Sequence, residues 1–210
     1  MAQYPKEEMR RAILAAAAEE LAEVGFEKAT LASIAARGGT SIGNLYKYFT
    51  SKEELFHAAV PRETARTLET LIRARVVALD AERDVRGLGP SHPYAKASDE
   101  LFEFVLAHRA QITFLLGRAE GTAYASFAED LVQGLTRLAG EYFGRIHPGS
   151  KLTAPQRRAL VRVYRAFLAS MTAILREESS ERALREATAH FTTYHLAGLK
   201  AFFESASVEK

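Results

Sequence analysis

The chain has 210 residues, a formal net charge of +2 and no cysteine, which excludes disulfides and cysteine metal sites. Hydrophobic residues make up 48% of it, enough for an ordinary core and too many for a disordered chain. The alanine-rich N-terminus lacks a signal-peptide pattern, and no apolar run approaches the ~20 residues of a membrane span. These features predict a soluble, cytoplasmic protein.

Helical periodicity dominates the chain, and no segment alternates with the period of a β-strand for long. The first predicted helix covers about residues 6–24, and Gly25 is its expected C-terminal stop. Thr30 is placed to cap a second helix. Gly38 and Gly39 interrupt that helix, because glycine is a poor helix-interior residue.

Two further caps follow this glycine turn. Ser41 is placed to cap a short third helix with the sequence "IGNLYKYF". The sequence "SKEE" at residues 51–54 matches a capping box and predicts a fourth helix from Lys52.

The remainder of the chain predicts longer helices separated by breaks. Helical spacing continues through residues 101–116, and the last two helices are expected at about 154–177 and 180–205. The expected breaks and caps are Pro61, "RGLGPSHP" at 86–93, "GRAEG" at 117–121, and the capping-box match of Thr153 with Gln156. We therefore predict an all-α protein, with a small helical unit at residues 1–52 and a larger helical domain at residues 53–210.

The short third helix has one apolar side. At 100° per residue, Ile42, Leu45 and Phe49 fall within an arc of ~60° that can pack on the first two helices. Ile42 is ambiguous, because it lies near the start of the helix, where it could instead touch a thymine methyl group.

The opposite side of this helix carries residue types that read DNA. Asn44 and Lys47 point away from the apolar arc with Gly43 beside them, while Tyr46 and Tyr48 lie on the flanks. Lysine can donate to guanine, and asparagine can pair bidentately with adenine. Gly43 would allow a close approach, and tyrosine hydroxyls can donate to phosphates. Helix, glycine turn and helix form the helix-turn-helix arrangement, in which the second helix is the reader.

The window between Glu27 and Glu53 contains no acidic residue. Such a window could face the phosphates of DNA, although a few cations over this length are also expected by chance. Its cations include Lys28, Arg37, Lys47 and Lys52.

The segment from Ile13 to Val60 resembles the DNA-binding domain of TetR-family transcriptional regulators. The resemblance rests on "GFEKATLASIA", "TSIGNLYKYF" and "SKEEL", which follow one another in the family's order and spacing. One departure lies in the turn, where Gly38, Gly39 and Thr40 replace the more frequent Ala-Gly-Val. We expect Thr40 to fill the place of the valine, and its hydroxyl needs a partner if it is buried.

The resemblance implies how the first domain binds DNA. It places the start of the second helix and the opening of the fourth on the phosphate backbone, and the third helix in the groove. From the wheel we expect Asn44 and Lys47 to read bases, and Tyr46, Tyr48 and Lys52 mainly to bind phosphates. The predicted DNA contacts are Thr30, Leu31, Thr40, Ser41, Ile42, Gly43, Asn44, Tyr46, Lys47, Tyr48 and Lys52.

For the larger domain, the resemblance implies dimerisation. The last two helices carry broad apolar bands that could form a four-helix interface between two subunits, although the same bands could be intramolecular core. The predicted interface residues are Leu160, Leu168, Met171, Leu175, Phe191, His195, Gly198 and Phe202.

The resemblance also implies a pocket for a small-molecule effector in the larger domain. Aromatic residues could line it and His108 or Arg118 could fix a polar group, although aromatics at helical spacing are usually packing. The predicted pocket residues are Phe102, His108, Phe114, Arg118, Tyr124, Phe127, Tyr142, Tyr164 and Phe167.

The resemblance thus implies a ligand-responsive regulator, and we expect a repressor that binds a pseudo-palindromic double-stranded operator as a homodimer. A small molecule would shift the fourth helix and release the protein from DNA. The alternatives are an enzyme and a protein-interaction adaptor. The acid-free window disfavours an adaptor, and HExxH, Walker, GxSxG and cysteine-nucleophile motifs are absent. We expect no enzymatic activity, no cofactor and no metal site.

Overall fold

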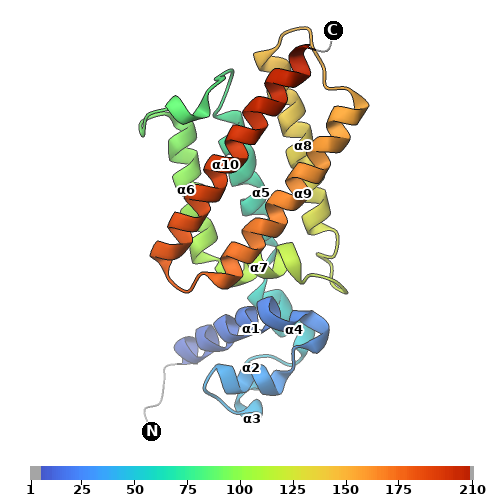
Figure 1. Ribbon diagram of the computed structural model, residues 1–210. Helices are drawn as coiled ribbons and strands as arrows, with labels where there is room; N and C mark the ends of the chain where they lie inside the picture. The colour runs from blue at the N-terminus through green and yellow to red at the C-terminus, as the bar shows by residue number, and fades with distance from the viewer. Residues whose placement is uncertain (1–5, 209–210) are drawn as a thin grey trace. The chain divides into compact units, whose positions relative to one another are not determined.

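The computed structural model describes residues 6–208, and all regular structure within this range is helical (Figure 1). The prediction of an all-α fold is thus confirmed for this part of the chain. The elements are α1 (Lys6–Lys28), α2 (Leu31–Arg37), α3 (Ile42–Leu45), α4 (Lys52–Ala59), α5 (Arg62–Val77), the 3₁₀ helix η1 (Val85–Gly87), α6 (Pro93–Ala107), α7 (Arg109–Gly117), α8 (Phe127–Ile146), α9 (Ala154–Glu177) and α10 (Glu181–Val208).

The chain packs as two compact units. Of the described residues, the first unit contains 6–66 and His108–Phe127, and the second contains Thr67–Ala107 and 128–208. This division into two units describes how the helices pack and does not assign a function to either unit. The functional division between residues 52 and 53 stays a prediction.

A glycine divides α1 where the sequence predicted a stop. Gly25 has φ 80° and ψ 170°, far from helical values, and helical structure resumes after it as far as Lys28. Before the break, Ile13, Ala17 and Leu21 recur at one-turn intervals and are buried. They form the face of α1 that packs in the core of the first unit.

The predicted cap of α2 is confirmed, with Ser33 as its second member. The Thr30 side-chain oxygen accepts from the Ser33 amide at 3.0 Å, and the Ser33 hydroxyl oxygen accepts from the Thr30 amide at 3.3 Å. Two otherwise unpaired donors at the helix start are thereby satisfied reciprocally.

The glycine turn after α2 is a Schellman motif. The Thr40 amide donates to the Ala35 carbonyl at 2.9 Å, and the Gly39 amide donates to the Ala36 carbonyl at 3.1 Å. Gly39 lies at φ 66°, a left-handed conformation that glycine adopts without a Cβ penalty. A Cβ at Gly38 would lie 3.3 Å from the Ile34 carbonyl oxygen, so this glycine keeps the turn closely packed.

The capping box predicted at the start of α4 forms only in part. The Ser51 side chain accepts from the Glu54 amide at 3.0 Å, as expected. The Glu54 carboxylate, however, accepts from the hydroxyl and the amide of Thr50, at 2.6 and 2.7 Å, instead of from the Ser51 amide. These bonds stabilise the charged form and lower the pKa of Glu54.

Aromatic rings close the core of the first unit. The Phe56 ring centroid lies 4.9 Å from that of Phe26, 5.7 Å from that of Phe114 and 6.1 Å from that of Tyr124. The Tyr124 hydroxyl donates to the Val60 carbonyl at 3.1 Å. Burial raises the pKa of Tyr124. These contacts hold α4 and α7 together.

The second unit is built mainly on long helices. α9 begins at a complete capping box of Thr153 and Gln156 and covers the predicted residues, while α10 begins one residue later than predicted and runs on to Val208. The helical spacing expected through residues 101–116 breaks at His108, between α6 and α7, without a glycine or proline to mark it. None of the helices within residues 6–208 combines the length and apolar character that a membrane crossing requires.

Candidate nucleic-acid interface and interior cavity

The helix expected to read DNA is short. Regular α-helix covers only Ile42–Leu45, and turns follow through Tyr48. The Ser41 side chain accepts from the Asn44 amide at 3.2 Å, which confirms the predicted cap. The Leu45 carbonyl accepts from the Phe49 amide at 3.1 Å. The backbone therefore stays helical in its course from Leu45 to Phe49.

Two side chains anchor this segment to the first unit. Leu45 is 0% exposed and Phe49 is 2% exposed. The Arg10 guanidinium lies 5.6 Å from the centre of the Phe49 ring. Ile42, by contrast, is 43% exposed, so the wheel placed it wrongly in the buried arc. It has the direction of Leu45 but lies one turn earlier, where no core covers it.

The outward face of the segment is polar and open. Lys47 is exposed and its side chain makes no hydrogen bond or ion pair within the described residues, and Tyr46 is 52% exposed. Gly43 is exposed, and a Cβ there would meet nothing within 4 Å. Tyr48 is half-buried on the flank. At Gly43 this surface leaves room for a ligand to approach the helix backbone closely. The side chain of Lys47 supplies a positive charge on the same surface.

Asn44 is less free than the wheel suggests. Its side-chain Nδ2 donates to the Thr40 hydroxyl oxygen at 2.8 Å, and both residues are half-buried. The bond supplies the partner that the threonine needs at this turn position. An amide group has two N–H donors and a carbonyl acceptor, so one donor and the acceptor of Asn44 remain for a base.

At the opening of α4, Lys52 is held against the end of α1. Its Nζ lies 4.5 Å from the centre of the Phe26 ring and donates to the Glu27 carbonyl at 3.3 Å. An ammonium group has three donors, so this single bond leaves capacity for a phosphate. Thr30 is exposed and Leu31 is half-buried at the start of α2, where the resemblance implies backbone contacts.

Within the acid-free window between Glu27 and Glu53, the charge of Arg37 is already paired with carboxylates. Its guanidinium contacts the carboxylates of Glu23 at 2.5 Å, Glu20 at 3.1 Å and Glu19 at 3.6 Å. These acids, Glu23 first, raise the pKa of Arg37. Lys47 and Lys52 on the α3 and α4 segments have no such carboxylate partner among the described residues, and Lys28 is exposed at the end of α1.

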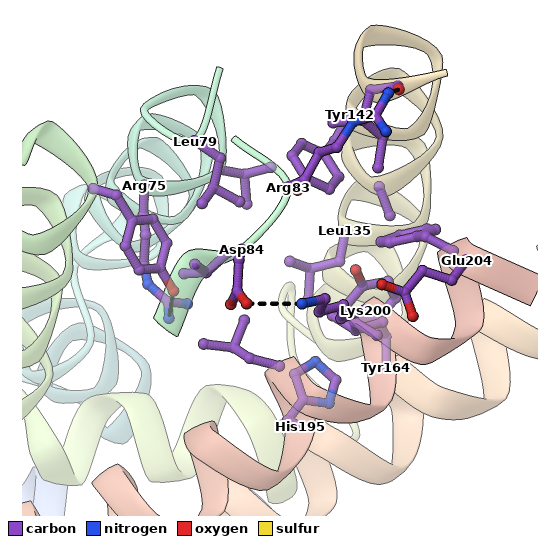
Figure 2. A pocket seen from close by; sticks show the side chains of 18 of the residues that line it. Arg75, Leu79, Arg83, Asp84, Leu135, Tyr142, Tyr164, His195, Lys200 and Glu204 are labelled. Carbon is purple, nitrogen blue, oxygen red and sulfur yellow. Dashed lines mark hydrogen bonds and ion pairs between the residues drawn. The ribbon is translucent and has the colours of Figure 1, made fainter. Parts of the chain in front are cut away.

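The second unit encloses a cavity of about 170 Å³ (Figure 2). Its wall comes from α5, the segment that follows it, α6, α8, α9 and α10, and most of the lining is apolar or aromatic. Figure 2 shows Asp84 and Lys200 facing one another, with 2.7 Å between Asp84 Oδ2 and Lys200 Nζ. This ion pair joins the segment after α5 to α10.

Further polar contacts fasten the same segment. Arg83 donates to the Ile146 carbonyl at 2.8 Å, and Arg145 donates to the Asp80 carbonyl at 2.8 Å. The Tyr142 hydroxyl donates to the Glu82 carbonyl, and burial raises the pKa of Tyr142. The cavity wall on this side is thus tied to α8 by side-chain to backbone bonds.

Tyr164 and His195 place polar groups in the cavity. The His195 ring stacks on Phe167 with 4.2 Å between ring centres and meets Tyr164 at 5.7 Å. Burial, together with the charge of Arg75, lowers the pKa of His195 to about 4, so the imidazole is neutral at pH 7. Burial raises the pKa of Tyr164, which keeps its hydroxyl protonated.

The predicted pocket residues do not all meet at this cavity. Tyr142, Tyr164 and Phe167 line it. Phe102 instead lies under the Arg185 guanidinium, 4.4 Å from its ring centre. The others, which belong to the first compact unit, are His108, Phe114, Arg118, Tyr124 and Phe127.

The predicted interface residues fall into three groups in the single chain. Leu160, Leu168 and Leu175 are 0%, 7% and 3% exposed, so their side chains are already covered by their own subunit. Gly198 is exposed. The half-buried members are Met171, Phe191, His195 and Phe202.

Some residues of these surfaces were not singled out from the sequence. Arg75 lies on the apolar stripe of α5, three residues after Ile72 and four before Leu79, and an arginine at such a position was the available signal. Ser98 and Tyr94 of α6 hold it at the cavity. Val163 and Tyr194 are large apolar side chains with 36% and 76% exposure. Tyr194 lies on an uncharged stretch of α10, which was the available signal, whereas Val163 stands between Arg162 and Arg165 and had none.

Comparison with known proteins bears on this geometry. Residues 13–59 match the model of the bacterial regulatory proteins of the tetR family. A TetR-like transcriptional regulator from Rhodococcus sp. RHA1 is 22% identical over 99% of this chain and 100% of its own, with a TM-score of 0.54. The ketosteroid transcriptional regulator KstR2 of Mycobacterium tuberculosis is 21% identical over 93% of this chain and 96% of its own, with a TM-score of 0.53. No curated protein sequence gives a significant match.

Residues 13–59 contain a helix-turn-helix and match the tetR-family model, which identifies this part of the chain as the DNA-binding domain of a regulatory protein. The structural likenesses extend over nearly the whole chain. The family match covers residues 13–59, and for the rest of the chain the structural likenesses show the fold alone.

Proposed function

We propose that this regulator is a repressor that binds a pseudo-palindromic operator as a homodimer and is released by a small molecule. In this scheme residues 1–52 read DNA, residues 53–210 bind the effector and dimerise, and the protein works in the cytoplasm. The observation that carries the proposal is the third helix, whose Leu45 and Phe49 are buried while Gly43 and Lys47 face outward.

The contacts of α3 and α4 assign different tasks to the exposed polar groups. Lys47 is uncommitted within the described residues and lies on the outward face, so it is available to base edges. Asn44 keeps an acceptor and a donor for a base while Thr40 holds it in place. Lys52 is fixed beside Phe26, which suits a phosphate contact that sets the register of the protein on DNA.

The dimer is proposed from the free faces of α9 and α10. Residues 166–175 and 187–199 carry no charged side chain, and Tyr194 stands out from this region with 76% exposure. A Cβ on Gly198 meets nothing within 4 Å, which leaves space for a second helix to approach. The buried Leu160, Leu168 and Leu175 would support this surface from inside. Two-fold symmetry would place the half-sites about one or more DNA turns apart.

The effector is proposed to bind the cavity of the second unit. The cavity is lined by α9 and α10, the helices that carry the proposed interface, so a ligand there could change the geometry of the dimer. We expect the change to reach α4 and to alter the separation of the two reading helices. Thermodynamic linkage then requires operator to weaken ligand binding by the factor by which ligand weakens operator binding.

Salt dependence tests the DNA-binding part of this proposal. Fluorescence anisotropy with a duplex enriched from random DNA should show the logarithm of the association constant falling linearly with the logarithm of salt concentration. The Lys52→Gln variant should reduce the slope by about one unit, because it removes one phosphate contact. Binding without a steep salt dependence, or no binding to any duplex, would contradict the proposal.

Gly198→Leu tests the dimer. The added side chain has open space in the single subunit but would separate two helices packed across an interface. Sedimentation equilibrium should show a monomer at concentrations where the wild type is a dimer, and operator affinity should fall with it. Gly144→Leu in α8, where a Cβ also meets nothing within 4 Å, is the matched control and should remain dimeric. A dimeric Gly198→Leu protein would rule out this interface.

A further inference from the structure

The cavity contains a cation without an acidic partner. Arg75 donates from Nε to Ser98 Oγ at 2.8 Å and from Nη2 to the Tyr94 hydroxyl oxygen, and its guanidinium lies 4.8 Å from the Tyr94 ring centre. Among residues 6–208, no carboxylate lies within ion-pair distance of Arg75. A half-buried guanidinium held only by neutral groups retains donors and uncompensated charge that an anion would satisfy.

Neutral hydrogen-bonding groups lie near this cation. The Tyr164 hydroxyl forms no hydrogen bond within the described part of the chain, although the residue is only 7% exposed. Arg75, Tyr164 and His195 all line the cavity, and the rings of Tyr164 and His195 lie 5.7 Å apart. A ligand bound at Arg75 would therefore have an O–H donor available in the same cavity.

The other charges of the lining are already committed or lie further away. Asp84 and Lys200 form an ion pair at 2.7 Å, and Arg83 donates to the Ile146 carbonyl at 2.8 Å. Glu204 lies one turn beyond Lys200 on α10, and Figure 2 shows it on the side away from Arg75. Arg75 is thus the cation best placed to receive a new anionic partner.

The size and lining of the cavity limit what accompanies that anion. A dry protein cavity of about 150 Å³ accepts benzene, and this cavity measures about 170 Å³. Leu135, Phe167 and Leu199 give its wall an apolar character that suits a hydrocarbon body. A guanidinium presents paired N–H groups that match a carboxylate better than a lone hydroxyl.

We infer that the cavity binds a small apolar carboxylate of about one ring in size, with the carboxylate on Arg75 and the Tyr164 hydroxyl and the hydrocarbon body against Leu135, Phe167 and Leu199. The inference rests on the proposed role of the cavity as the effector site. It adds the chemical class of the effector.

The test compares acids with their own amides, which have nearly the same shape and no charge. The pairs are benzoate and benzamide, phenylacetate and phenylacetamide, cyclohexanecarboxylate and its carboxamide, and octanoate and octanamide. Calorimetry on the full-length protein without DNA should find at least one ring acid that binds about tenfold tighter than its amide. If no acid is preferred over its amide, or if octanoate is preferred over every ring acid, the inference is overturned.

Matched variants assign the preference to residues. Arg75→Met should reduce the acid-to-amide ratio to about one, and Tyr164→Phe should weaken the acid about fivefold with little change in packing. Arg73→Met, on the exposed side of the same helix and outside the cavity lining, should leave the ratio unchanged. Binding of the amides and thermal melting show whether each variant is folded. A ratio that survives in Arg75→Met overturns the inference, whereas acid binding that leaves DNA affinity unchanged would refute only the proposed switch.

Discussion

The reading surface comes from one short segment, Thr40–Lys52, whose caps and anchors are mostly local, whereas the cavity wall comes from α5, α6, α8, α9 and α10. On the reading surface, polar groups such as Lys47 stand in solvent with little attachment. In the cavity, polar groups such as Asp84 are tied to partners far along the chain. Reading residues should therefore be replaceable without loss of stability, while lining and supporting residues should affect stability and function together.

The largest effect is expected in the second unit. Leu160→Ala removes a side chain that is 0% exposed and should lower the free energy of unfolding by about 2–5 kcal/mol through lost burial and a residual cavity. Urea unfolding measures the loss, and sedimentation measures dimerisation separately. A variant with normal stability but a weakened dimer would place Leu160 in the interface and not in the core.

Lys47→Ala should weaken operator binding without changing the stability of the protein. Because the side chain is exposed and makes no hydrogen bond or ion pair within the described residues, the free energy of unfolding should be unaffected. Operator binding should weaken by about 1–3 kcal/mol and specificity should relax at one base pair of each half-site. Anisotropy against a set of single-substituted operators measures both quantities. Equal weakening on every operator would show that Lys47 binds phosphate and does not read a base.

Acidification should destabilise the cavity more than the reading surface. The pKa of His195 is 6.5 when unperturbed and about 4 in the folded protein, so the unfolded state binds its proton first. The stabilising contribution is complete above about pH 6.5 and is lost as the pH falls towards 4, which amounts to roughly 1–2 kcal/mol by pH 5. Unfolding of His195→Gln over the same range should show a smaller pH dependence. An unchanged slope in this variant would contradict the assignment.

Gly43→Ala should separate folding from binding. A Cβ at this helical position meets nothing within 4 Å, so the substitution should stabilise the protein by about 0.5–1 kcal/mol. If the backbone approaches DNA closely here, operator affinity should fall about fivefold, roughly 1 kcal/mol. Thermal melting measures the change in stability, and fluorescence anisotropy on the same preparations measures the change in operator affinity. Unchanged operator affinity would show that the helix does not approach DNA at this residue.

The smallest effect is expected from Thr40→Val, which removes the hydroxyl oxygen that accepts from Asn44 at 2.8 Å. Asn44 should become less ordered, and discrimination at its base pair should fall by about 0.5–1 kcal/mol with little loss of overall affinity. Competition between operators that differ at a single adenine measures this. Undiminished discrimination would mean that the hydrogen bond does not position Asn44 for reading.

The same difference between the regions explains what could be predicted. Caps at Thr30, Ser41, Ser51 and Thr153 depend on residues a few positions apart, and the structure confirms their side-chain bonds. The burial of Leu45 and Phe49 likewise followed from periodicity. The fold class of the described residues was thus accessible from local patterns.

The sequence failed to predict burial or location in two situations. In one, the position of a residue along the helix axis decided its burial, and in the other a partner far away in the chain decided its location. A helical wheel gives direction only, so it placed Ile42 with Leu45 although the core does not extend over the first turn. The placing of Arg75 at the cavity requires Ser98 and Tyr94 from another helix, a pairing that no short-range pattern encodes. Most of the local structure of residues 40–52 was therefore predictable, and most of the cavity was not.

The most direct test of the central claim is selection of binding sites from random duplex DNA by the wild-type protein and by Lys47→Ala in parallel. We expect the wild type to enrich a pseudo-palindrome with half-sites about one or more helical turns apart, and Lys47→Ala to enrich the same spacing with a symmetric pair of positions relaxed. Failure of the wild type to enrich any sequence, or enrichment of a single asymmetric site, would contradict a dimer that reads DNA through α3.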